Sequence, residues 1–443
     1  MTSHRFNRLA LTLGAPLLVF AVVLGVLSFA NRASDRFADG ATGGLPGVPA
    51  GVAVPGDTAA AVANLEDAVR DDPASADFQA ALGDALYQLS RETGEAALIE
   101  RSQQAFDSAI ALDPEHVTAT IGQGTLALAR HRFRRGLEYG LTARRLAPDL
   151  VRPYTVLIDA RIELGQYRAA AQTIDRLLAL KPTLAAYSRA SYYRQLNGDL
   201  DGAVKAMNFA VSASGGSGEG AAYVQSLLGE LNIDRGRYGQ ARDAFEAVLA
   251  VDPGYLPARE GIAHLDATSG RVDRALRSYR AIVAEQPIAA YALAMADVES
   301  VAGKPAAAQR HVELAAREIE RLRASGVNAD AGFVLFEANY GSREQAVELG
   351  RRIWQEAPSV DSANAYAWAL HQAGRDRAAS RFSERSLRLG SADPAFLFDA
   401  GIIARAAGRT AQARRYLERV VEQSPRFSPV SGPKAERLLA RLR

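Results

Sequence analysis

Six histidines are the side chains of this sequence that could most readily bind a metal or move a proton, because imidazole titrates near neutral pH. No two of them are spaced as His-x-x-x-His or His-Glu-x-x-His. The 443 residues include no cysteine, which excludes disulfides, thiolate metal sites and cysteine nucleophiles. We therefore expect surface or packing roles for the histidines, with no metal site. They are His4, His116, His131, His264, His311 and His371.

Other sequence patterns that support catalysis or cofactor binding are missing too. Gly122, Gly124 and Ala127 fit the Gly-x-Gly-x-x-Ala pattern of dinucleotide sites, but that pattern must follow a strand and open a helix. Here Gly124 falls inside a predicted helix. There is no Gly-x-Ser-x-Gly elbow and no Walker loop. The sequence thus predicts no enzyme, no catalytic residue and no cofactor.

The charged residues nearly balance, with 52 basic and 50 acidic side chains and a formal net charge of +2. Nucleic-acid binding usually needs a concentrated basic face. We therefore expect no nucleic-acid partner. Ala, Leu and Arg are abundant, and these residues lose little conformational freedom in a helix, so the composition favours an all-α chain.

An uncharged segment near the N-terminus predicts export. Residues 9–30 carry no charge and follow a short stretch that holds Arg5 and Arg8. A helix of this length can span the roughly 30 Å hydrocarbon core of a bilayer. Residues 1–30 are either a retained signal anchor or a cleaved signal peptide, because Ser28-Phe29-Ala30 has small residues at the spacing that signal peptidase requires. Residues 31–57, rich in Gly, Ala and Pro, are predicted to be a flexible linker.

The remaining sequence repeats with a period of about 34 residues. In the clearest unit, Ala221–Pro253, Gly229 allows two helices to approach and Gly236 closes the first helix in a left-handed conformation. Ala241 then lies where the two helices cross, Phe245 fills the groove behind them, and a proline ends the unit. The turn glycine recurs at Gly165, Gly198, Gly236, Gly270, Gly303, Gly341, Gly374 and Gly408. Five residues after each comes Ala170, Ala203, Ala241, Ala275, Ala308, Ala346, Ala379 or Ala413.

These units resemble tetratricopeptide repeats (TPRs), over roughly residues 58–427. The resemblance implies an all-α, right-handed superhelical solenoid of about ten helix pairs, whose concave face is lined by the first helices and binds peptides or partner domains. An unpaired second helix at Ala60–Arg70 begins the array, and residues 428–443 are expected to be a C-terminal capping helix. The segments Tyr187–Met207, Phe336–Gly341 and Ala365–Arg375 resemble those of long exported bacterial TPR proteins of undefined role.

Helical periodicity predicts which side chains of the first helices face the groove. Tyr192 and Trp368 are the expected anchors for a partner, since large amphipathic rings dominate binding hot spots; the alternative is that both rings only pack between helices. The acidic members suggest a basic or cationic ligand. The predicted groove residues are Asp159, Ser188, Tyr192, Gln195, Glu230, Asp234, His264, Asn364, Trp368 and His371.

Taken together, these patterns predict an extracytoplasmic scaffold or adaptor that binds protein or peptide partners, with a possible part in assembly of the cell envelope. Contact with the membrane is expected through residues 9–30 only, and if that segment is cleaved the protein is secreted. The alternative is a periplasmic module for a small ligand or a metal, motivated by His264 and the nearby acidic groups. The sequence leaves the oligomeric state open.

Overall fold

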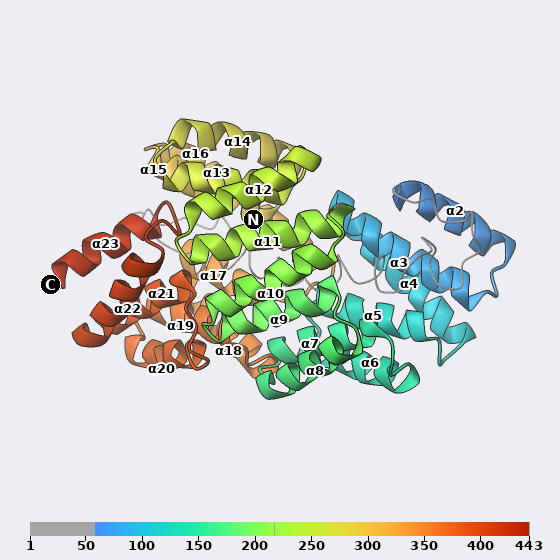
Figure 1. The fold of residues 1–443 in the computed structure, drawn as a ribbon. Coiled ribbons are helices and arrows are strands. Elements are labelled where there is room, and N and C mark those ends of the chain that lie inside the picture. The colour runs from blue at the N-terminus through green and yellow to red at the C-terminus, as the bar shows by residue number, and fades with distance from the viewer. Residues whose placement is uncertain (1–57, 217, 443) are drawn as a thin grey trace, which may run out of the picture.

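The computed structural model describes residues 58–442 apart from residue 217, and this part of the chain contains 22 helices and no strand (Figure 1). The hydrophobic segment and the linker predicted for residues 1–57 lie outside the described residues. None of the described helices combines the length and the apolar character that crossing a bilayer requires. The all-helical solenoid predicted from the repeat is therefore confirmed for the array itself.

Twenty of these helices form ten antiparallel pairs, as the repeat predicts, between a single helix at each end. α2 (Thr58–Asp71) precedes the pairs and α23 (Ser431–Arg441) follows them. The first five pairs are α3 (Ala76–Thr93) with α4 (Ala96–Leu112), α5 (Val117–Ala129) with α6 (Phe133–Leu146), α7 (Val151–Glu163) with α8 (Tyr167–Leu180), α9 (Leu184–Leu196) with α10 (Leu200–Ala213), and α11 (Gly218–Asp234) with α12 (Tyr238–Val251). The other five are α13 (Leu256–Thr268) with α14 (Val272–Glu285), α15 (Ala289–Val301) with α16 (Pro305–Ala324), α17 (Ala331–Tyr340) with α18 (Arg343–Glu356), α19 (Val360–Gln372) with α20 (Asp376–Ser386), and α21 (Pro394–Ala406) with α22 (Thr410–Gln423).

Small residues allow the paired helices to pack closely. A Cβ atom added to Gly229 would lie 2.6 Å from the ring of Phe245, and one added to Gly261 of the next pair would lie 2.3 Å from the same ring. The Phe245 ring thus fills a slot between two glycine-bearing helices, as expected. The eight alanines predicted at helix crossings are all buried, with at most 3% of their surface exposed.

Seven of the eight predicted turn glycines have a positive φ, between 67° and 81°. Gly341 is the exception, and the prediction of a left-handed turn there was wrong, because its φ is −112° and its ψ is −140°. α17 has only 10 residues, and its final turn is closed by the Glu337 carboxylate, which accepts a hydrogen bond from the Ser342 N–H at 2.9 Å. A Cβ at Gly341 would lie 2.5 Å from Glu337, so this glycine is required for close approach rather than for a left-handed turn.

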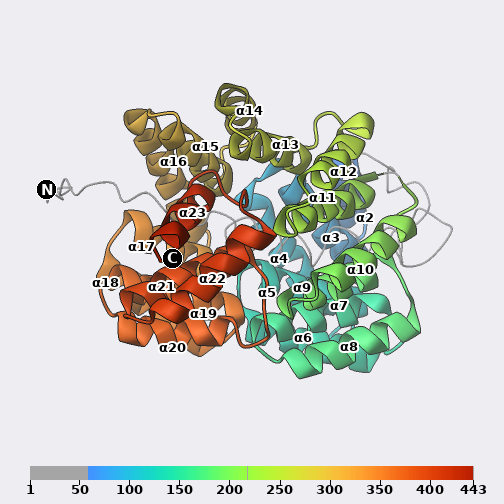
Figure 2. The same cartoon turned by 60° about the vertical axis from the view of Figure 1, so that its left-hand side comes forward.

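The N-terminal and C-terminal halves of the array contact each other along one edge, and we call this line of contacts the seam. The turns within the second, third, fourth and fifth helix pairs contact the loops that follow the seventh, eighth, ninth and tenth pairs, respectively. In Figures 1 and 2 the orange and red helices of the C-terminal half accordingly lie beside the green helices of the middle. The four contacts join His131 with Asn328, Gly165 with Pro358, Gly198 with Gly390, and Gly236 with Gln423.

Hydrogen bonds hold the seam at several points. The Tyr167 hydroxyl accepts a hydrogen bond from the buried Val360 N–H at 2.7 Å. Near the C-terminal end, the Ser424 hydroxyl donates to the Ile233 carbonyl at 2.7 Å. One apolar cluster contains buried residues of α7 to α11 and of α15 to α21, so the two halves of the array share a core. Closure therefore fills much of the space that an open superhelix would leave as a concave groove.

Candidate binding pocket at the seam

A strained histidine marks the first contact of the seam. His131 lies one 34-residue period before Gly165 and so occupies the position of a turn glycine. Its φ is 55°, and it is the one non-glycine residue with a positive φ in the described part of the chain. Such a conformation costs about 1–3 kcal/mol and persists only where the surroundings enforce it. Here Nδ1 lies 2.7 Å from the Asn328 carbonyl oxygen, and Nε2 lies 3.7 Å from a carboxylate oxygen of Asp330.

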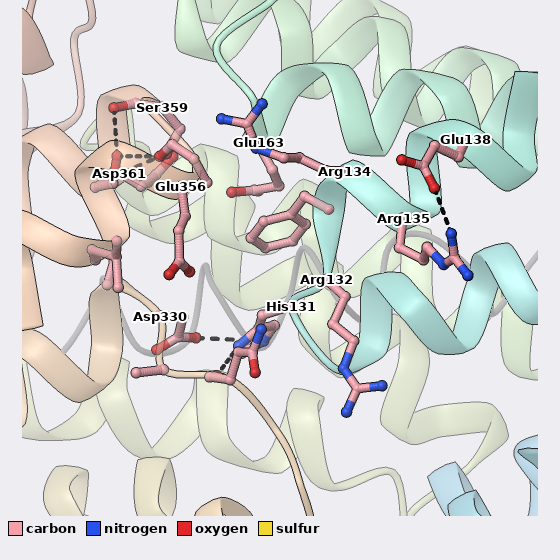
Figure 3. Close-up of a pocket in the computed structure, with 17 residues that line it drawn as sticks. His131, Arg132, Arg134, Arg135, Glu138, Glu163, Asp330, Glu356, Ser359 and Asp361 are labelled. Carbon is pink, nitrogen blue, oxygen red and sulfur yellow. Dashed lines mark hydrogen bonds and ion pairs between the residues drawn. The ribbon is translucent and has the colours of Figure 1, made fainter.

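Beside this histidine a cavity of about 350 Å³ opens between the two halves of the array. One wall is formed by the turn before α6 and by the end of α7, and the other by the loop before α17 and by the loop between α18 and α19. In Figure 3, Glu163 and Glu356 enter from different helices and extend their carboxylates into the space between them. The pocket therefore exists only because the seam is closed.

Two carboxylates in the pocket have no ion pair to any described residue. Asp361, in the first turn of α19, has 6% of its surface exposed, and its Oδ2 atom is buried without a partner. Burial and the charge of Asp393 raise its pKa to about 7. Glu163 also lacks a cationic partner, and burial together with the charges of Asp361 and Asp330 raises its pKa well above the usual range. Both groups would be stabilised by a positive charge in the cavity.

Further carboxylates continue from the pocket along the inside of the seam, and we call Glu163, Asp361, Asp393 and Asp234 the acidic row. Each influences the next electrostatically, although Glu163 and Asp234 come from the N-terminal half and the other two from the C-terminal half. Burial raises the pKa of every member. Asp393 is in part satisfied, because it caps α21 by accepting hydrogen bonds from two backbone N–H groups.

Three arginines line the outer part of the pocket, and all three are exposed. Arg135 pairs with Glu138 at 2.9 Å, while Arg132 and Arg134 make long hydrogen bonds of 3.4 and 3.5 Å to backbone carbonyls. In Figure 3 the guanidinium groups of Arg132 and Arg135 point away from Glu163 and Asp361, whereas that of Arg134 lies beside Glu163 and donates to the Gln355 carbonyl on the opposite wall. The inner wall of the pocket is therefore lined by carboxyl groups, whereas the arginines at its rim are exposed to solvent, where screening weakens their effect.

The pocket offers no activated nucleophile. The hydroxyls of Ser359 and Ser362 are engaged in capping bonds at the start of α19. His131 already has Nδ1 against a carbonyl and Nε2 against Asp330, so neither nitrogen faces a serine. In the described part of the chain no three His, Asp or Glu side chains are placed to hold a metal ion. The geometry suits binding of a charged group rather than covalent chemistry.

The two predicted aromatic anchors are buried in the closed array. Trp368 has 1% of its surface exposed, and its indole N–H donates to the Asn339 side-chain oxygen at 2.8 Å. Tyr192 has 7% exposed and lies near enough to Asp361 and Glu163 for their charges to raise its pKa, after the larger effect of burial. These positions favour the alternative that both rings pack between helices.

Three predicted residues at the centre of the array also serve internal contacts. Asp159 forms a two-pronged ion pair with the buried Arg189, at 3.0 and 2.7 Å. Ser188 is 2% exposed and donates to the Ala185 carbonyl. Asn364 is fully buried and donates to Asp399 at 3.0 Å.

Of the other predicted residues Asp234 is buried, and the rest are half-buried. Gln195 donates to Asp234, a member of the acidic row, at 2.9 Å. Burial and the charge of Glu260 raise the pKa of Glu230 to about 8. Burial lowers the pKa of His264 to about 4. His371 pairs with Asp376 at 2.6 Å.

The pocket residues themselves were not predicted from the sequence, although the sequence contains some indications of them. Glu163 follows Asp159 by one helical turn, and Asp361 precedes Asn364 by three residues, so each shares a helix face with a predicted residue. A histidine in the position of a turn glycine is also visible in the sequence. The proximity of residues 131, 163, 330 and 361 is not, because it depends on closure of the array.

Comparison with protein families places these repeats in a known class. Three family models, each described as tetratricopeptide repeat, match the chain. The first matches residues 232–298. The second matches residues 56–106, 155–218 and 197–255, and the third matches residues 395–426. Together the matches cover just over half of the 443 residues. No curated protein sequence matches the chain.

Several solved structures are similar to parts of the chain, all at low sequence identity and with TM-scores below 0.5. A TPR protein of Thermus thermophilus is 21% identical, with a TM-score of 0.38, over 42% of this chain and 95% of its own. Human IFIT1, in its dimer with m7Gppp-AAAA, is 16% identical, with a TM-score of 0.48, over 75% and 77%. The APC/C hetero-tetramer Cut9–Hcn1 is 13% identical, with a TM-score of 0.37, over 87% and 93%. These likenesses concern the fold alone.

Proposed function

Because the chain belongs to the tetratricopeptide repeat family, we propose that it is a scaffold that binds protein partners and that the seam pocket is one of its contact points. TPR arrays present extended surfaces to other proteins, and the described part of the chain consists of such an array between two single helices. A partner that inserts a side chain at the seam would contact both halves of the array at once.

The observation that carries this proposal is the anionic pocket. Unpaired buried carboxylates destabilise a fold, and the repeat architecture does not require them. The buried Asp361 and the half-buried Glu163 are nevertheless placed together in a cavity that solvent can enter. Groups with strongly perturbed pKa values in a cavity favour a binding role over a structural one.

Photocrosslinking in cells tests the scaffold proposal. A photoreactive residue at Arg132 or Glu356, both exposed at the pocket, should capture the same dominant protein from either side. Arg280 on α14 is exposed but does not line the pocket, so it provides the matched control position. Capture at all three positions alike, or at none while the protein remains folded, would argue against a partner at the seam.

We further propose that the array works outside the cytoplasm of a bacterial cell, tethered by residues 9–30 and contributing to envelope assembly. The support is the uncharged segment followed by the Gly-, Ala- and Pro-rich linker. Alkaline phosphatase, which is active only after export, can be fused after Arg443 to test the location. An inactive fusion would contradict the proposal, and the mass of the mature N-terminus would distinguish an anchor from a cleaved signal peptide.

The second candidate function is a binding module for a small organic ligand. The cavity of about 350 Å³ favours it, because small-molecule sites occupy about 300–1,000 Å³. Calorimetric titration of the full chain with small cations would measure such binding directly. Heat that persists when Glu163 and Asp361 are neutralised would place the ligand elsewhere.

A further inference from the structure

The seam pocket holds an excess of carboxyl groups over basic groups at its inner wall. Glu163 and Asp361 approach from opposite halves of the array, and Asp330 lies beside them near His131. The charge of each of the two aspartates raises the pKa of Glu163 in addition to the effect of burial, and no basic side chain lowers it measurably. A folded protein usually pairs such groups, because an isolated buried charge is costly.

Asp361 gives an independent indication of a missing partner. It is more than nine-tenths buried, it lines the cavity, and its Oδ2 atom accepts no hydrogen bond from any described residue. Buried carboxylate oxygens normally accept at least one hydrogen bond. A donor that enters the cavity would satisfy this oxygen.

The size and the rim of the cavity limit what that donor can be. A volume of about 350 Å³ accommodates one amino-acid side chain or a small organic cation. A planar guanidinium or a primary ammonium group donates several hydrogen bonds to carboxylates. Arg132, Arg134 and Arg135 at the rim are exposed, so water screens their repulsion and leaves the inner wall attractive to a cation.

We propose that the seam pocket binds an organic cation, a guanidinium or a primary ammonium group, between the carboxylates of Glu163 and Asp361. This inference deepens the proposed scaffold function and rests on it, since a basic side chain of a partner is one source of the cation. A free small molecule with the same group is the other source. In either case the cation bridges the two halves of the array at the seam.

Calorimetry on the full chain tests the inference with two probes. The first is N-acetyl-L-arginine amide, and the second is a five-residue peptide with arginine at its centre. Citrulline versions of both serve as controls, since they keep the size and lose the charge. We expect the arginine probes to bind, and Glu163→Gln or Asp361→Asn to weaken the binding at least tenfold by removing a charge-assisted hydrogen bond. The matched control is Asp297→Asn, a buried carboxylate on α15 that does not line the pocket and should leave the affinity unchanged.

Proton release provides a measurement on the unmodified chain. Because the pKa of Asp361 is raised to about 7, cation binding near pH 6 should expel a proton, so the heat should depend on the ionisation enthalpy of the buffer. Glu163, whose pKa is also raised, lines the pocket together with His131, Asp330, Glu138, Glu356 and the three exposed arginines, so the series is repeated with Glu163→Gln and with Asp361→Asn. A smaller release in the Asp361→Asn variant identifies Asp361 as a source.

The outcomes separate the inference from the proposed function. Binding of both arginine probes supports both ideas. If only N-acetyl-L-arginine amide binds, the cation site stands and the source is a small molecule, which argues against the scaffold role at this pocket. Equal binding of arginine and citrulline probes, or no binding of either, overturns the inference. Partner capture by photocrosslinking would remain a separate test of the scaffold.

Discussion

Alanine at Gly236 should loosen the C-terminal end of the seam, whereas alanine at Gly374 should not. The two glycines have nearly the same left-handed backbone, with φ of 69° and 72°. Alanine therefore brings a similar strain of about 1–2 kcal/mol at either position. The surroundings differ, because a Cβ at Gly236 would lie 2.2 Å from the Gln423 carbonyl oxygen, while a Cβ at Gly374 would meet nothing within 4 Å.

The extra effect at Gly236 follows from the contacts that must move. Relieving the clash requires a displacement of about 1 Å, since carbon and oxygen atoms do not approach closer than about 3 Å. The Gln423 side chain donates to the Asp234 carbonyl and the Ser424 hydroxyl to the Ile233 carbonyl, each at 2.7 Å. Losing two such bonds costs about 2 kcal/mol in total. The equilibrium for opening this contact should therefore shift about 30-fold.

Hydrogen exchange measures that opening at one residue. The Arg426 N–H donates to the Tyr238 hydroxyl across the seam at 2.8 Å, so its exchange reports separation of the two segments. We expect it to exchange about 30-fold faster in Gly236→Ala than in Gly374→Ala. The Val360 N–H, bonded to Tyr167 at another contact of the seam, shows whether the opening spreads. Small-angle scattering adds the overall size of each variant.

Equal exchange of the Arg426 amide in the two variants would refute the reasoning. It would mean that the backbone strain of alanine, which both variants share, accounts for the whole effect. The close approach of Gly236 to Gln423 would then contribute nothing to holding the seam closed.

Three further changes test the buried polar groups by thermal unfolding. Tyr167→Phe should cost about 1–3 kcal/mol, because the buried Val360 N–H loses its acceptor; stability equal to the unmodified chain would contradict this. Burial raises the pKa of Asp399 to about 8, so the folded state holds a proton that the unfolded state loses above about pH 4, and stability should fall by about 1.4 kcal/mol per pH unit from there toward pH 8. Asp399→Asn should remove that fall, and an unchanged profile would exclude Asp399 as its source. Burial lowers the pKa of His264 to about 4, so between pH 6.5 and 4 the unfolded state takes up a proton that the folded state does not, and stability should fall as the pH drops. His264→Asn should make stability less dependent on pH in this range. An unchanged slope in the variant would show that other groups cause the fall.

Much of the fold could be predicted from local sequence. The alanine five residues after each turn glycine predicted a helix crossing, and all eight alanines are buried there. The glycine of each turn predicted a left-handed backbone, which failed at Gly341 because the carboxylate of Glu337 closes that turn instead. These features repeat because each helix pair packs against its immediate neighbours under the same constraints.

The candidate site could be predicted only in part. Helical periodicity predicted a face of the first helices, including Asp159 and Asn364, and implied that this face is open. The closed array instead buries Trp368 and Tyr192 and pairs Asp159 with Arg189. Whether the groove residues contact a partner stays a prediction.

By itself, then, the sequence determined the helix pairs, their number and the small residues where they cross, because these depend on contacts within one or two repeats. Only the tertiary structure decided that residues near 131 and 165 meet residues near 328 and 358, and thereby brought Glu163 to Asp361. The physical reason is that each pair is rotated slightly relative to the one before it. That small rotation cannot be detected in the sequence of a single repeat. Over five pairs it adds up and brings each turn against the loop that follows the pair five positions later.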